Sequence, residues 1–120
     1  MHCVGATWGS ELHPDLLVAG ERIRKGTGGE DGYSGFSVRH PVSGASHPTG
    51  LEDMLRERGV ADVVVVGLAT DYCVKETALD AARLGFAATV LADGIRAVNL
   101  EPGDGARAVA EMAAAGVTIA

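Results

Sequence analysis

The sequence has few lysines, cysteines and aromatic residues, and it lacks a long apolar run. Lys25 and Lys75 are its only lysines, it has two cysteines, and aromatic residues make up 4% of the chain. The longest apolar run, Val63–Ala69, is too short to cross a membrane. Two cysteines do not form a disulfide framework, and no charged segment followed by an apolar core opens the chain. We therefore expect no signal peptide and a reducing, cytoplasmic setting.

The net charge limits the classes of binding partner, and the length limits the number of domains. A formal charge of -6 argues against nucleic acid and anionic membranes as partners. With 47% hydrophobic and 22% charged residues, the composition is typical of a globular protein. A length of 120 residues suffices for one domain but not for two. We expect a single domain over residues 1–120 that binds a small molecule, and a homo-oligomer stays open.

The second half of the chain alternates helix and strand patterns. The expected elements are helices at 49–59, 71–84 and 104–115 and strands at 63–67, 87–91 and 117–119. Thr49 and Glu52 fit a capping box for the first helix. The valine run is typical of a strand buried on both faces, and Met112 and Ala113 are expected to face inward. This alternation predicts an α/β fold with a parallel sheet and right-handed crossovers.

The first half is rich in Gly, Pro, Ser and His. One short strand is expected at about Leu17–Ile23, and residues 26–50 are expected to be loop. A loop this long in a small domain is usually functional or disordered. Lys25 would then follow a strand and precede a Gly-rich stretch. By spacing alone, a solvated surface lysine is the better interpretation.

Cys73 lies where the valine strand passes into a helix. Ligands of open α/β sheets bind at the carboxyl ends of strands. A thiol at a helix N-terminus meets unpaired N–H groups and the positive end of the helix dipole, which favour the nucleophilic thiolate. A nucleophile would also need a cationic neighbour, for which Lys25 is the candidate. From position alone, a buried structural cysteine is an equally good interpretation.

Four segments carry a more specific signal because they occur together and in order. They are HCVGATWGSELHPDL, RKGTGGEDGYSGF, GLATDYCVKETALDA and LADGIRAVNLEPGDGARAVAEMAAAGVTI. Together they resemble the nicotinamidase/pyrazinamidase branch of the isochorismatase-like cysteine hydrolases. The resemblance implies a three-layer, Rossmann-like isochorismatase-like fold with a parallel sheet. It also implies a cytoplasmic hydrolase of NAD salvage, within pyridine nucleotide biosynthesis, that converts nicotinamide and water into nicotinate and ammonia.

The resemblance implies roles for individual residues around the strand–helix junction. Cys73 matches the nucleophile that forms a thioester, and Lys25 matches the lysine that stabilises the thiolate. Leu68 and Ala69 match a pair joined by a cis peptide. The amides of Ala69 and Cys73 match an oxyanion hole.

Further residues match the surroundings of that junction. Tyr33 and Tyr72 match positions that line the pocket for the substrate ring. His2 matches one ligand of a divalent metal, which is zinc, iron or manganese in the family. Asp71 is interpreted as a helix cap and loop organiser and not as the base, and Trp8 as a packing residue.

The family's catalytic aspartate and its other metal ligands lie upstream of the segment that begins at His2. A single histidine makes an incomplete metal site. We therefore expect the C-terminal two-thirds of the family domain, with the N-terminal strands missing and little amidase activity from this chain alone. The alternatives are another isochorismatase-like amide or N-carbamoyl hydrolase, a non-catalytic remnant, or a redox-sensing protein that uses Cys73.

Overall fold

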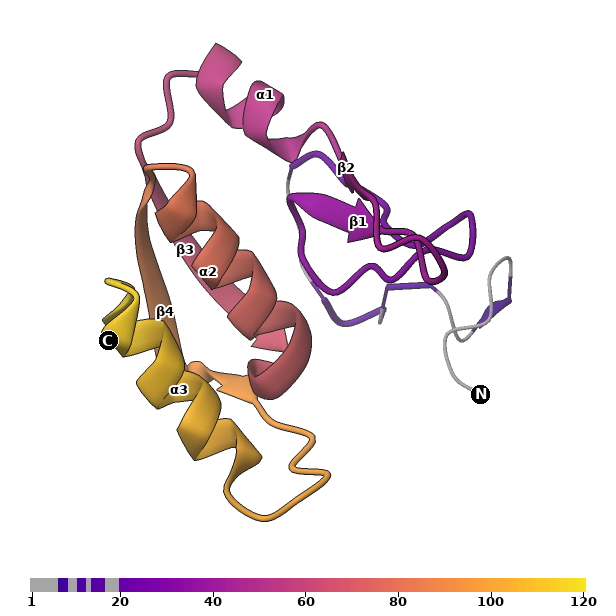
Figure 1. Ribbon diagram of the computed structural model, residues 1–120. Helices are drawn as coiled ribbons and strands as arrows, with labels where there is room; N and C mark the ends of the chain where they lie inside the picture. Colours follow the sequence, from indigo (N-terminus) through magenta and orange to yellow (C-terminus); the bar gives the residue numbers. More distant parts are fainter. Residues whose placement is uncertain (1–6, 9–10, 13, 17–19) are drawn as a thin grey trace.

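The computed structural model describes residues 7–8, 11–12, 14–16 and 20–120. Its elements, shown in Figure 1, are β1 (Ser37–Arg39), β2 (Ser46–Pro48), α1 (Leu51–Glu57), β3 (Asp62–Leu68), η2 (Thr70–Val74), α2 (Lys75–Arg83), β4 (Ala87–Arg96), α3 (Asp104–Ala114) and β5 (Thr118–Ile119). Strands β3, β4 and β5 form a parallel sheet in that order, and β1 pairs with β2 as a separate antiparallel hairpin.

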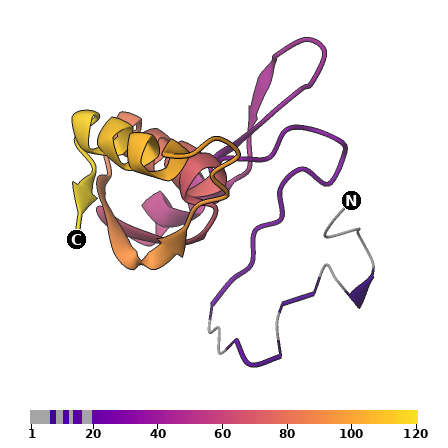
Figure 2. The ribbon, with the colours of Figure 1, turned by 90° about the horizontal axis from the view of Figure 1, so that it is seen from below.

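The order α1–β3–α2–β4–α3–β5 confirms the predicted α/β class with a parallel sheet. Figures 1 and 2 show α2 and α3 together on one side of the strands. Val74, Ala78 and Ala81 recur at helical spacing and are buried, so the helix that follows β3 turns an apolar stripe to the sheet. Val90 of β4 and Met112 of α3 are the largest fully buried side chains at this interface.

The opposite face of the sheet is open among the described residues. Along β3, Val64, Val66 and Leu68 are 62%, 53% and 73% exposed, whereas Val63 and Val65 pack against the core. Successive side chains of a strand point to opposite faces, and α2 and α3 cover only one of them. The prediction that this strand is buried on both faces is therefore wrong for the part of the chain that is described, where two layers are present.

Strand β4 is longer than predicted. It begins at Ala87 as expected but continues past Leu91 to Arg96. The pairing with β3 shifts register between Val65 and Gly67, so Gly67 pairs with Ile95. Because of this irregularity, β4 continues to pair with β3 beyond Leu91, where the predicted apolar strand ends.

The first helix is not capped as predicted. Its N-cap is Gly50, with a φ of 93°, and no side chain caps it. The Thr49 hydroxyl donates a hydrogen bond to the carbonyl of Gly35 at 2.6 Å and accepts one from the amide of Leu51 at 3.3 Å. Glu52 pairs with Arg56 one turn further on, at 2.9 Å. The amide of Thr49 donates to the carbonyl of Phe36 and not to Glu52, so the two residues do not form the predicted capping box.

The last helix turns a slightly different face inward. Met112 is buried as predicted, but Ala113 is exposed, and Ala108 and Gly105 are buried in its place. Positions 105, 108 and 112 form one stripe at the helical period, and the residue after Met112 lies about 100° away from that stripe.

The described part of the first half corrects three predictions. Residues 20–25 contain no strand, because no backbone hydrogen bond pairs them with another described segment, and 17–19 lie outside the described residues. The hairpin of β1 and β2 occupies part of the predicted loop. Trp8 is 81% exposed and is not a packing residue. In the described ranges, none of the helices is both long and apolar enough to span a membrane.

Candidate active site

The two residues predicted to cooperate at the site lie together. The ammonium Nζ of Lys25 donates to Cys73 Sγ at 3.4 Å, across a separation of 48 residues in the sequence. Both side chains are partly buried. The same ammonium donates to the carbonyl oxygens of Gly32 and Tyr33, the latter at 3.1 Å. The contact places a cationic group at hydrogen-bonding distance from the sulfur of Cys73.

Glycines shape the loop that presents the lysine. We call residues 25–36 the lysine loop. Gly26 has a φ of 68°, in the left-handed region that glycine adopts without strain. Gly32 packs so closely on this turn that a Cβ there would lie 2.9 Å from the backbone nitrogen of Gly26. The loop folds back on itself, and the carbonyls of Gly32 and Tyr33 therefore reach the ammonium of Lys25.

Cys73 is presented by a wide first helical turn. The helical segment begins at Thr70, one residue before the predicted start at 71, and its first turn is a π-helix over Thr70–Val74. The carbonyl of Ala69 accepts hydrogen bonds from the amides of Tyr72, at 3.1 Å, and Val74, at 3.0 Å. The amide of Cys73 lies between these two. The peptide bond between Leu68 and Ala69 is cis, at the position where the resemblance implies one.

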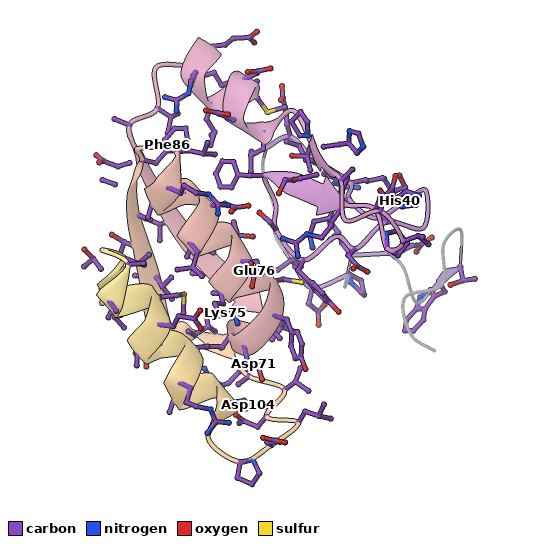
Figure 3. All side chains as sticks on the ribbon, in the orientation of Figure 1. His40, Asp71, Lys75, Glu76, Phe86 and Asp104 are labelled. Carbon is purple, nitrogen blue, oxygen red and sulfur yellow. The ribbon has the colours of Figure 1, made fainter. Side chains whose placement is uncertain are left out.

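Asp71 links this turn to the segment that follows β4. Its carboxylate accepts hydrogen bonds from the amides of Val98, at 3.0 Å, and Asn99, at 2.9 Å. Burial alone would raise the pKa of Asp71, but these hydrogen bonds outweigh it and hold the pKa below its ordinary value. Asp71 is thus a loop organiser, as predicted, but not a cap, because no side chain caps η2. Figure 3 shows it at the end of the helix that carries Lys75 and Glu76.

The two tyrosines lie next to each other, on the outer side of the site. Their ring centroids are 5.6 Å apart with an interplanar angle of 37°, and Tyr33 is 49% exposed. Both line an open, mostly polar hollow of about 620 Å³, whose lining includes neither Lys25 nor Cys73. A role for these rings in binding a substrate stays a prediction.

The predicted metal ligand, His2, lies outside the described residues. Across residues 7–8, 11–12, 14–16 and 20–120, no group of three His, Cys, Asp or Glu side chains is placed to hold a metal ion. The described side chains therefore do not supply a donor set that fits a metal.

Sequence analysis missed the polar contacts between the lysine loop and α2. Ser34 donates to Asp80 at 2.6 Å, and the amide of Gly35 donates to Thr77 Oγ1 at 2.8 Å. Cys73, Thr77 and Asp80 are spaced i, i+4 and i+7, which places them on one helix face. That spacing is visible in the sequence and could have indicated a helix face on which polar residues follow Cys73.

The isochorismatase domain matches the whole chain, residues 1–120. The chain therefore belongs to the isochorismatase family. Within it, the chain is 43% identical to the nicotinamidase of Escherichia coli (strain K12) over 121 aligned residues, which cover 98% of this chain and 55% of that protein.

Solved structures agree with this assignment. A protein from L. infantum, solved in complex with nicotinate, is 36% identical with a TM-score of 0.86, over 99% of this chain and 58% of its own. The pyrazinamidase of Pyrococcus horikoshii, solved in complex with zinc, is 34% identical with a TM-score of 0.72, over 100% of this chain and 61% of its own. The chain thus spans somewhat more than half the length of these relatives.

Proposed function

We propose that this chain carries the nucleophile of a nicotinamidase-type amidohydrolase, which converts nicotinamide and water into nicotinate and ammonia. The observation that carries the proposal is the 3.4 Å contact between the Lys25 ammonium and the Cys73 sulfur, at the C-terminal end of β3. Similarity to nicotinamidases supports the choice of substrate. A lone ammonium beside a thiol would also fit other reactions, and similarity to nicotinamidases favours amide hydrolysis among them.

The first half of the reaction forms a thioester. The Cys73 thiolate attacks the carboxamide carbon, and the carbonyl oxygen becomes an oxyanion. The amides of Ala69 and Cys73 are the donors we assign to that oxygen. The carbon–nitrogen bond then breaks, and ammonia leaves with a proton that the resemblance assigns to an aspartate upstream of the His2 segment.

The second half releases the acid. Water attacks the thioester carbon and one of its protons returns to the upstream aspartate. The carbon–sulfur bond breaks, nicotinate leaves with its other proton lost to solvent, and the sulfur returns to the thiolate beside Lys25. The ammonium of Lys25 stabilises the thiolate at the start and at the end of the cycle. In the family a divalent metal bound by His2 and its partners would hold the substrate ring, but the steps above do not depend on it.

The test is ammonia release from nicotinamide. The chain is assayed alone and with the part of the E. coli nicotinamidase that it does not cover fused before Met1. We expect activity from the fusion and little from the chain alone. Cys73→Ser should lower the activity of the fusion by at least about a thousandfold, as expected when a nucleophile is lost. Cys3→Ser is the matched control and should leave it unchanged.

Two outcomes would contradict the proposal. Full activity of Cys73→Ser would show that the sulfur is not the nucleophile. Ammonia release from an N-carbamoyl compound but not from nicotinamide would favour the alternative family reaction. Full activity of the chain alone would leave the nucleophile in place but overturn the need for an upstream aspartate.

A further inference from the structure

Asp80 holds the lysine loop against the helix that follows Cys73. Its side chain is buried, with the residue 6% exposed. Oδ2 accepts hydrogen bonds from the hydroxyls of Ser34, at 2.6 Å, and Ser37, at 3.2 Å. Oδ1 pairs with the guanidinium of Arg83. Both carboxylate oxygens are therefore engaged, and one of them binds the loop directly.

A second contact runs parallel to the first. The amide of Gly35 donates to Thr77 Oγ1 at 2.8 Å, and the Ser34 hydroxyl accepts from the amide of Phe36 at 3.1 Å. Thr77 and Asp80 follow Cys73 on the same helix face, at i+4 and i+7. The helix face that carries the sulfur of Cys73 therefore also binds the C-terminal end of the lysine loop through hydrogen bonds.

The end of the loop that binds α2 lies next to the carbonyl groups that accept hydrogen bonds from the Lys25 ammonium. Lys25 Nζ donates to the carbonyl of Tyr33 at 3.1 Å, and Tyr33 is the neighbour of Ser34. It also donates to the carbonyl of Gly32. The rest of the loop is rich in glycine and has few side chains to fix it. A chain of contacts therefore runs from Asp80 through Ser34 and Tyr33 to the ammonium beside Cys73.

We infer that Asp80 is a positioning residue, which fixes the lysine loop through Ser34 so that the Lys25 ammonium stays beside Cys73. The inference rests on the proposed role of Cys73 as nucleophile, but reactivity of the thiol tests it without an amide substrate. A buried, hydrogen-bonded carboxylate that receives two serine hydroxyls is a rigid anchor because leaving those hydroxyls unpaired is costly. Its own negative charge would disfavour a nearby thiolate, so an effect through position and an effect through charge have opposite signs.

The experiment measures the rate constant for alkylation of Cys73 by iodoacetamide at neutral pH, in a Cys3→Ser background. We expect Asp80→Ala to lower the rate constant about tenfold, because the ammonium of Lys25 would no longer be held beside the sulfur. Asp80→Asn keeps an acceptor for Ser34 and should lower it less. In a Lys25→Met background, Asp80→Ala should cause no further loss.

Asp104→Ala is the matched control because Asp104 is also helix-borne and also pairs with an arginine at i+3, Arg107, away from the lysine loop. It should leave the alkylation rate unchanged. If Asp80→Ala does not fold, as judged by circular dichroism, Ser34→Ala and Asp80→Asn carry the same test.

Three results would overturn the inference. Equal losses in the presence and absence of Lys25 would mean that Asp80 does not act through the ammonium. Faster alkylation in both Asp80 variants would indicate a charge effect, and faster alkylation in Asp80→Ala alone would indicate loosening of the fold. If the fusion hydrolyses no nicotinamide but the alkylation pattern holds, the proposed function fails and the positioning role of Asp80 stands.

Discussion

The ammonium of Lys25 lies 3.4 Å from the sulfur of Cys73, although 48 residues separate them in the chain. One partner comes from a glycine-rich loop and the other from the first turn after β3. The contact brings one of the two lysines of the sequence within hydrogen-bonding distance of the cysteine at the strand–helix junction. A reactive thiol requires a cationic neighbour of this kind.

The first prediction concerns this pair. Lys25→Met should lower the alkylation rate of Cys73 by about tenfold or more, because the thiolate loses a cation at hydrogen-bonding distance. Lys75→Met is the matched control, since Lys75 is the other lysine and pairs with Glu76 at 3.8 Å and Glu111 at 3.7 Å. Alkylation by iodoacetamide, followed by mass spectrometry, measures both. An equal loss in the two variants would show that net charge, not the contact, controls the thiol.

The second prediction concerns the close turn of the lysine loop. Gly32→Ala would place a Cβ 2.9 Å from the backbone nitrogen of Gly26, so the turn must open. We expect a loss of about 1–3 kcal/mol in the free energy of unfolding, as for overpacking elsewhere, and slower alkylation of Cys73. Urea unfolding and the alkylation assay measure the two effects.

Gly28→Ala is the control for this substitution. A Cβ there would meet the flexible carboxylate end of Glu30, at 2.7 Å, and not backbone. The side chain can move aside, so little change is expected. Wild-type behaviour of Gly32→Ala would contradict the close packing of the turn.

The third prediction is a dependence of stability on pH. The pKa of Asp71 is below its ordinary value in the folded chain, because hydrogen bonds from Val98 and Asn99 outweigh the effect of burial. The stabilisation is therefore fully present above the pKa of the unfolded chain and is lost as the pH falls through the folded pKa, below about pH 4. Asp71→Asn should lower stability at neutral pH and reduce its loss on acidification.

Urea unfolding at a series of pH values measures this effect as the difference between Asp71→Asn and the wild type. The difference removes the contributions of Glu30 and Asp104, whose pKa values are also lowered. Asp93→Asn, an exposed carboxylate of β4, is the control. If the difference is constant with pH, Asp71 does not contribute as an ionised hydrogen-bond acceptor.

The fourth prediction tests which face of the sheet is packed. Val90 is fully buried beneath the helices, whereas Val64 is 62% exposed on the opposite face. Val90→Ala should lower the free energy of unfolding by about 2 kcal/mol, because it removes packed methyl groups and leaves a cavity. Val64→Ala should change it by less than about 0.5 kcal/mol. Chemical denaturation compares the two, and a similar cost at both positions would show that another surface covers Val64.

The outline of the second half could be predicted from the sequence because its signals are local. The apolar stripe of Val74, Ala78 and Ala81 and the valine run need only the periods of helix and strand to be recognised. The exposure of Val66 could not be predicted, because four valines in a row look the same whether one face or both are covered.

The candidate site divides in the same way. Cys73 at a strand–helix junction and Lys25 before a run of glycines are marked by the residues around them, and the family resemblance joins them. The hydrogen bond from Ser34 to Asp80 joins residues 46 positions apart, and no local sequence pattern predicts that their side chains pair. The π-helical first turn likewise could not be predicted, because it depends on the backbone conformation at Ala69 and on how η2 packs.

By itself, the sequence determined the α/β alternation and, to within one residue, the start of the helix that follows β3, because both depend on neighbouring residues and their periodicity. Only the tertiary structure decided which face of the sheet is covered, how the glycine-rich loop folds back, and that Lys25, Ser34 and Asp80 form one connected set. Contacts between residues far apart in the chain depend on how whole elements pack, and no local pattern of residue types encodes that packing.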